Sequence, residues 1–109
     1  MADTFKNLAR ALLGTSETTI GAAVPASRSW IGKRVWVCNG HTAAVSVTLH
    51  HRLAGEAVSQ TNAILQSASI PSFTTQVLDE LDLATTDLLS GYASVANVVS
   101  VNVYGDEVA

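Results

Sequence analysis

Residues 33–51, KRVWVCNGHTAAVSVTLHH, contain two strand-like runs separated by a turn. In the second run large apolar residues alternate with small or polar ones, which is typical of a strand with one buried face. The apolar members of this alternation are Val45, Val47 and Leu49. The first run, residues 33–38, is followed by an Asn-Gly pair that favours a turn. The simplest interpretation is a hairpin of two core strands.

The first of these runs carries large apolar side chains on both faces. Trp36 points to the side opposite Val35 and Val37. In a sheet covered on one side only, Trp36 would stand in water. We therefore predict that it contacts another subunit or a packed helix.

The rest of the chain repeats short strand patterns, with turn signals spaced roughly 8–12 residues apart, as in all-β sandwiches and barrels. Strands are expected over residues 15–24, 30–38, 44–50, 62–69, 73–78, 88–94 and 98–104. Residues 79–87 are expected to form a loop with a short strand or turn around Leu81–Leu83, and a helix is the alternative there. The pattern predicts an all-β, antiparallel β-sandwich or jelly-roll-like fold. The last two strands look like a hairpin about Ala96-Asn97, and residues 106–109 look like a frayed tail. The expected core is Val35, Val37, Val45, Val47, Leu49, Val99 and Val101.

Residues 2–13, ADTFKNLARALL, differ from the remainder of the chain. Their apolar residues recur at helical spacing, which predicts a short amphipathic helix ending at Gly14. A helix this short is marginal in water unless it packs on something. We expect a helical arm over residues 1–14 and a β-sandwich domain over residues 15–109. Whether the arm docks on its own domain or on a neighbour stays open.

Composition limits the classes of partner. Charged residues make up 14% of the chain and the net charge is −3, whereas soluble domains typically carry about 25% charged residues. So few charges suit a protein that buries part of its surface against copies or partners. No basic stripe is present, so nucleic-acid binding is not expected. No apolar run is long enough to span a membrane as a helix, and the first residues lack the plan of a secretory signal. We expect a protein made in the cytoplasm and assembled there.

No arrangement of residues predicts catalysis, a metal site or a cofactor. The acidic stretch DELDLATTD at residues 79–87 lacks the central glycine of a calcium loop. His50 and His51 are adjacent and would point to opposite faces of a strand, so they cannot share one metal ion. Cys38 is the only cysteine, which excludes an intrachain disulfide. We expect no enzyme activity.

A run of motifs over about residues 15–108 resembles small β-sandwich virion proteins of tailed bacteriophages. The matching positions are Val24-Pro25-Ala26, Lys33, Val35, Val37, Asn39, Val45, Val47, Leu49, Leu78-Asp79, Leu81, Leu83, Asp87, Leu89, Ala93, Val99, Val101, Val103, Gly105 and Glu107. The chain departs from the pattern at Thr86, where a glycine is usual, and at residues 21–23, where an aromatic is often found. Residues 2–13 lie outside the resemblance.

The resemblance implies a structural protein of the particle, attached to capsid or tail and often self-associating. We expect a homo-oligomer, most plausibly a trimer, that contacts other virion proteins in particles assembled in the host cytoplasm. The residues predicted to form the assembly interface are Phe5, Leu8, Leu12, Trp30 and Trp36. The alternative is a carbohydrate- or receptor-binding module of a phage tail, in which Trp30, Trp36 or Tyr92 would stack on a sugar ring.

Overall fold

The chain folds into antiparallel β-strands. The computed structural model describes residues 4–53, 55–79 and 82–108. The strands are β1 (Thr4–Leu12), β2 (Thr18–Thr19), β3 (Ser29–Asn39), β4 (Val45–Arg52), β5 (Ala63–Ile70), β6 (Thr75–Asp79), β7 (Asp82–Leu83), β8 (Leu88–Ala93) and β9 (Val99–Val108), with a 3-10 helix η1 (Gln60–Asn62) before β5. The described residues contain no α-helix, and none of their helices could cross a membrane. The all-β antiparallel class predicted from the sequence is confirmed.

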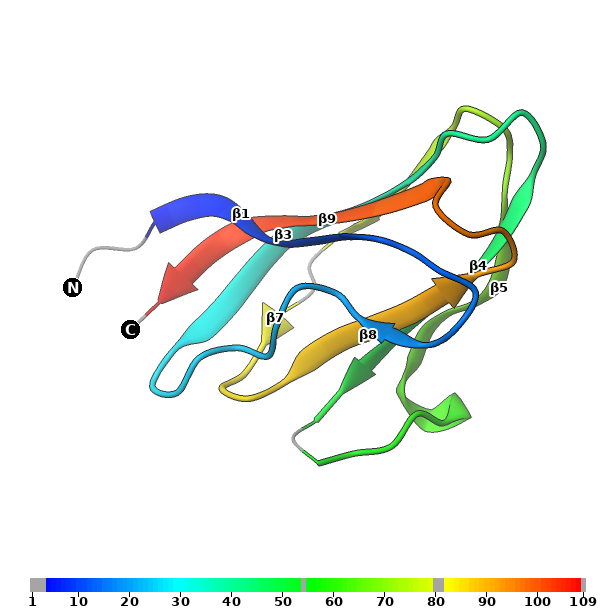
Figure 1. Ribbon diagram of the computed structural model, residues 1–109. Helices are drawn as coiled ribbons and strands as arrows, with labels where there is room; N and C mark the ends of the chain where they lie inside the picture. The colour runs from blue at the N-terminus through cyan, green and yellow to red at the C-terminus, as the bar shows by residue number, and fades with distance from the viewer. Residues whose placement is uncertain (1–3, 54, 80–81, 109) are drawn as a thin grey trace.

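The strands form two sheets, which lie in two layers (Figure 1). Sheet A has the order β1-β9-β3-β6, with the short β7 also beside β3. Sheet B has the order β2-β8-β4-β5. Successive strands along the chain therefore pass repeatedly from one sheet to the other.

One apolar core takes side chains from both sheets. On β9 buried and partly buried residues alternate, so Val99, Val101 and Val103 are fully buried. This is the period of two that a strand with one inward face requires. The predicted core residues Val35, Val37, Val45, Val47, Leu49, Val99 and Val101 are all at most 1% exposed, so this prediction is confirmed.

The predicted N-terminal helix is wrong, because residues 4–12 form strand β1. β1 pairs with β9 from Thr4 opposite Glu107 to Leu12 opposite Ser100, with a bulge between Asn7 and Ala9. In the strand, Ala9 and the following Leu13 enter the core, whereas Leu12 is 55% exposed. A short helix would leave the edge of β9 unpaired, whereas β1 satisfies its backbone groups along the whole length. This segment is part of sheet A, not a separate arm.

The two predicted hairpins are also wrong. β3 and β4, the two runs of residues 33–51, lie in different sheets, and so do β8 and β9. β3 instead pairs with β9, and β4 pairs with β8 as well as with the following strand β5. The predicted frayed tail extends β9 to Val108, because it lies between β1 and β3. Turn residues in the sequence mark where the chain reverses, but not which sheet it enters next.

Asn39 ties together the loops at one end of the two sheets. Its side chain is fully buried, and its Nδ2 donates to the carbonyl oxygens of Ala43, Ile70 and Pro71 at 3.0, 2.9 and 3.2 Å. Its Oδ1 accepts the backbone N–H of His41 at 2.8 Å. One amide side chain thus satisfies backbone groups of two loops that would otherwise be unpaired.

A glycine in β8 tests how tightly sheet B is packed. A Cβ atom on Gly91 would lie 2.6 Å from Leu49 Cδ2 and would also meet the carbonyl oxygen of Thr48. Gly91→Ala is expected to lower the free energy of unfolding by about 1–3 kcal/mol or more, because backbone and core side chain must shift. The measurement is chemical denaturation.

The matched control is Gly14→Ala, since nothing lies within 4 Å of a Cβ at Gly14. This change should alter the free energy of unfolding by no more than about 0.5 kcal/mol. Equal stability of the two variants would contradict the packing of β8 against β4.

Candidate functional site

Two surfaces of the molecule are built in a way that could serve recognition: the outer side of sheet A and a pocket at one end of sheet B. Among the described residues no three His, Cys, Asp or Glu side chains are grouped as a metal site. The acidic stretch is dispersed within its described part. Asp79 lies 3.5 Å from Arg34, while Asp87 accepts the backbone N–H of Ala84 at 3.1 Å. Glu80 lies outside the described residues.

The neighbouring histidines of β4 each meet a different carboxylate. His50 Nδ1 lies 3.2 Å from Glu17 Oε2, and His51 Nε2 lies 2.9 Å from Asp87 Oδ2. Ser90 is directly opposite His50 on β8, so serine, histidine and glutamate come together. Sequence reasoning missed this cluster because Glu17 and Ser90 are distant from His50 along the chain.

This cluster is not arranged as a catalytic triad. Nucleophile and base should lie within hydrogen-bond reach of one another. The Ser90 hydroxyl is fully buried and has no hydrogen-bond partner within the described part of the chain. Ser90 lies on β8 between β2 and β4, and the Glu17–His50 bond connects the residue just before β2 with β4. The Glu17 and His50 side chains cover the small Ser90 side chain, which explains why Ser90 is buried on the outer side of sheet B.

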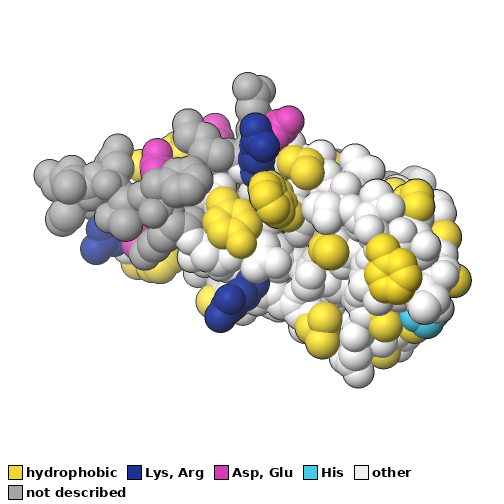
Figure 2. All heavy atoms as spheres, turned by 90° about the horizontal axis from the view of Figure 1, so that it is seen from above, with side chains coloured by type: hydrophobic (Ala, Val, Ile, Leu, Met, Phe, Trp, Pro, Cys, Tyr) yellow, Lys and Arg dark blue, Asp and Glu magenta, His cyan; other side chains and the backbone are white. Residues whose placement is uncertain are grey.

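The outer side of sheet A carries rows of side chains that run from β1 to β6. In the central row Arg10, Asn102, Trp36 and Val77 are direct neighbours. Together with the rows on either side they define the sheet A face. Its members are Asn7, Arg10, Leu12, Arg34, Trp36, Cys38, Thr75, Val77, Asp79, Ser100, Asn102 and Tyr104. Figure 2 shows this side of the molecule, with hydrophobic side chains grouped in the middle and basic side chains beside them.

The centre of the sheet A face is aromatic and uncharged. Trp36 and Tyr104 meet edge to face, with their ring centroids 5.7 Å apart and their planes at 64°. Asn7 donates to Asn102 Oδ1 at 3.2 Å, so two polar side chains of the face bond to each other. The edge strands carry Arg10 on β1 and Asp79 on β6. The third charge, Arg34 on β3, is directly opposite Tyr104 and lies 3.5 Å from Asp79 Oδ1 through its Nε. Beside β9 a shallow depression of about 350 Å³ is lined by Arg10, Ala11, Leu12, Ser100 and Asn102.

The structure separates the residues predicted for the assembly interface. Trp36 and Leu12 are 43% and 55% exposed and belong to the sheet A face. Leu8 packs partly against the core, and the side chain of Phe5 lies outside the described part of β1. Trp30 is only 6% exposed, and its Nε1–H donates to Glu107 Oε2 at 3.0 Å. Trp30 is therefore a core residue, and its assignment to a surface contact is corrected.

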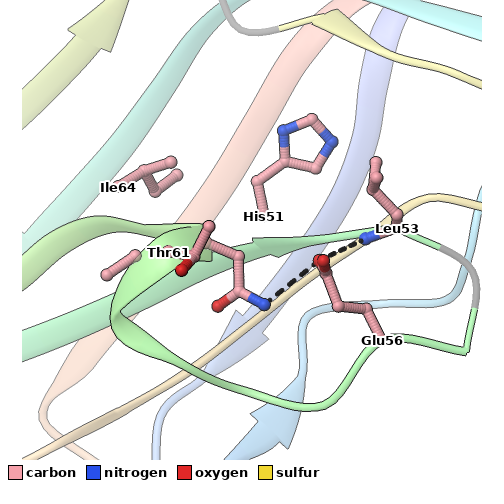
Figure 3. A pocket seen from close by; sticks show the side chains of 7 residues that line it. His51, Leu53, Glu56, Thr61 and Ile64 are labelled. Carbon is pink, nitrogen blue, oxygen red and sulfur yellow. Dashed lines mark hydrogen bonds between the residues drawn. The ribbon is translucent and has the colours of Figure 1, made fainter.

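A pocket of about 250 Å³ opens where β4 ends and β5 begins (Figure 3). We refer to it as the end pocket. Its lining residues are His51, Leu53, Glu56, Thr61, Asn62, Ala63 and Ile64. The sequence predicted only a loop over most of this segment, because its polar residues follow no period.

Hydrogen bonds fix the Glu56 carboxylate in the end pocket. Glu56 Oε1 accepts the backbone N–H of Leu53 and the Asn62 amide, both at 3.1 Å. These two bonds, with smaller contributions from the charges of His51 and Arg52, lower the pKa of Glu56 below its ordinary value of 4.5. Partial desolvation opposes the shift, and the bonds outweigh it. The carboxylate is therefore ionised at neutral pH.

Comparison of the chain with protein-family models, with curated proteins and with solved structures finds no match.

The Glu56 bonds predict a pH dependence in the loop between β4 and β5. Because the folded-state pKa of Glu56 is lowered, its stabilising effect is present above pH 4.5 and is lost as pH falls through the lowered value. In an NMR titration the Leu53 amide shift should therefore change below pH 4.5. Glu56→Gln keeps an acceptor oxygen but should abolish this titration. A Leu53 amide that titrates at or above pH 4.5 would contradict the bond.

Proposed function

We propose that the two sheets form a jelly-roll β-sandwich. Jelly rolls contain eight strands in two Greek keys, divided between two sheets. If β7 is set aside as a short addition beside β3, the orders β1-β9-β3-β6 and β2-β8-β4-β5 correspond to that arrangement. Jelly rolls occur in viral capsid proteins and in lectins, so the fold is compatible with either proposed activity but does not choose between them.

We propose that the protein is a structural protein of a bacteriophage virion, which self-associates and attaches to the capsid or tail. The phage assignment rests on the sequence resemblance over about residues 15–108. Many of the matching positions are buried, including Val35, Val47, Val99 and Val101. These positions support a shared fold more than a shared activity. Support for assembly has to come from the surface.

The observation that carries the proposal is the sheet A face. The central parts of protein interfaces are enriched in Trp, Tyr and Arg and depleted in Lys, Glu and Asp. The sheet A face shares the aromatic and arginine part of that composition, with Trp36 and Tyr104 at its centre. Asp79 is the one acid among its defined members, and Asp106 on β9 begins the next row. On the same strand Trp30 is buried in the core, whereas Trp36 is 43% exposed. A partner covering Trp36 would remove this apolar surface from water.

The alternative, a carbohydrate- or receptor-binding module that stacks sugars on aromatic residues, has less support. Trp30 is buried and cannot stack on a ligand. Trp36 lies on the outer side of sheet A, whereas Tyr92 lies on β8 in sheet B. The exposed aromatics named for this activity therefore do not form one platform.

Self-association is tested by light scattering and sedimentation on the purified full chain. The expected result is an oligomer, most plausibly a trimer. Trp36→Ser should weaken its association about 30-fold or more, as for a hot-spot residue worth at least about 2 kcal/mol. A strictly monomeric protein at high concentration would overturn the proposal.

The matched control is Tyr92→Ser, because Tyr92 is a similarly exposed aromatic, at 36%, in the other sheet. It should leave association unchanged, and circular dichroism should show that both variants keep the β fold. Equal effects of the two substitutions would remove the sheet A face from the interface. Labelling of intact particles with an antibody, viewed by electron microscopy, separates capsid from tail attachment, and absence from the particle would contradict a virion role.

A further inference from the structure

Hydrogen bonds hold the wall of the end pocket. They connect the described residues of the segment between β4 and β5 to one another. Glu56 N–H donates to Leu53 O at 2.9 Å, and Arg52 Nε donates to Glu56 O at 2.8 Å. The buried Asn62 donates to Ala57 O at 2.9 Å and accepts from Ser59 N–H at 3.1 Å. A pocket shaped before its ligand arrives loses less conformational entropy on binding.

Three polar groups of the end pocket remain available to a ligand, and together they fit a ligand that both donates and accepts hydrogen bonds. Both bonds to the Glu56 carboxylate use Oε1, so Oε2 has no partner among the described residues. His51 gives its Nε2 to Asp87, which leaves Nδ1 as an acceptor in the neutral ring. The exposed Thr61 hydroxyl can donate or accept. Figure 3 labels Glu56, His51 and Thr61 among the residues that line the end pocket.

The remaining lining is aliphatic. Leu53, Ala63 and Ile64 contribute to the wall, and Leu53 is 55% exposed. At about 250 Å³ the pocket lies just below the roughly 300–1,000 Å³ typical of sites for drug-sized ligands. It has room for one small ring with polar edges and an apolar face.

We propose that the end pocket binds one ring of a neutral saccharide. Ring hydroxyls donate to Glu56 Oε2 and to His51 Nδ1, and exchange a bond with the Thr61 hydroxyl, while C–H groups lie on Ile64 and Leu53. A cationic side chain is a poorer match, because it offers no acceptor for Thr61. It would also meet the nearby Arg52, whose charge reaches Glu56. This site is separate from the sheet A face and does not depend on self-association.

The test is an NMR titration of isotope-labelled full chain with the methyl glycosides of glucose, galactose, mannose and N-acetylglucosamine. At least one glycoside should give saturable shifts, with a millimolar dissociation constant, at the amides of Leu53, Glu56, Thr61 and Ile64. N-acetyl-arginine amide, the cationic probe, should give none there. Saturable binding of that probe alone, or no binding of any glycoside, would overturn the proposal.

Variants locate the binding groups. Glu56→Gln keeps one acceptor oxygen for Leu53 and Asn62 but replaces the free oxygen with an amide nitrogen, so affinity should fall about tenfold or more. Thr61→Val replaces the hydroxyl with a methyl group of similar size and should weaken binding severalfold even if Glu56→Gln disturbs the loop. Asp79→Asn, the same kind of change in sheet A, is the control and should bind as the wild type does. Unchanged affinity in both pocket variants would place the saccharide elsewhere and refute this site.

Discussion

The pairing of β3 with β9 is the constraint on which the rest of the structure depends. These two strands run side by side from Ser29 opposite Val108 to Asn39 opposite Val99. Val35 and Val37 thereby come level with Val103 and Val101, so four valines form one wall of the core. The same register brings Trp36 beside Asn102 and close to Tyr104 on the other side of the sheet. Core and exposed face are two sides of one ladder.

Strand β1 completes sheet A around that ladder. β9 lies between β1 and β3, so both of its edges are paired within the chain. β9 therefore offers no free edge to a strand of another molecule. β1 also widens the sheet A face, since Arg10 and Leu12 continue the rows that begin on β9. A surface suited to assembly thus depends on a segment whose own sequence pattern favours a helix.

The exposed side of sheet B is built differently. Its outer side carries the Glu17–His50 pair and the buried Ser90, so part of that side is closed by polar bonds within the chain. Its open feature is the end pocket, whose wall is organised by Glu56 and Asn62. In two places an asparagine side chain hydrogen-bonds to loop backbone: Asn62 donates to Ala57 O, and Asn39 donates to Ile70 O. The aromatic centre of the sheet A face and the end pocket lie on different sheets and share no residue.

Alternation of valine and leucine with polar residues determined, from the sequence alone, that the chain is all-β, and it identified part of the core, including Val47 and Val101. This succeeds because a strand alternates its faces with a period of two, wherever the strand lies. Only the tertiary structure decided which strands pair and that residues 4–12 form a strand. It also decided that Trp30 is buried while Trp36 is exposed, and that the Glu56 carboxylate lies in the end pocket. These depend on contacts between residues far apart along the chain, such as Trp30 with Glu107 and Lys6 with Gly105. Local pattern carries no information about such distant neighbours, and their free energy outweighs local helix preference.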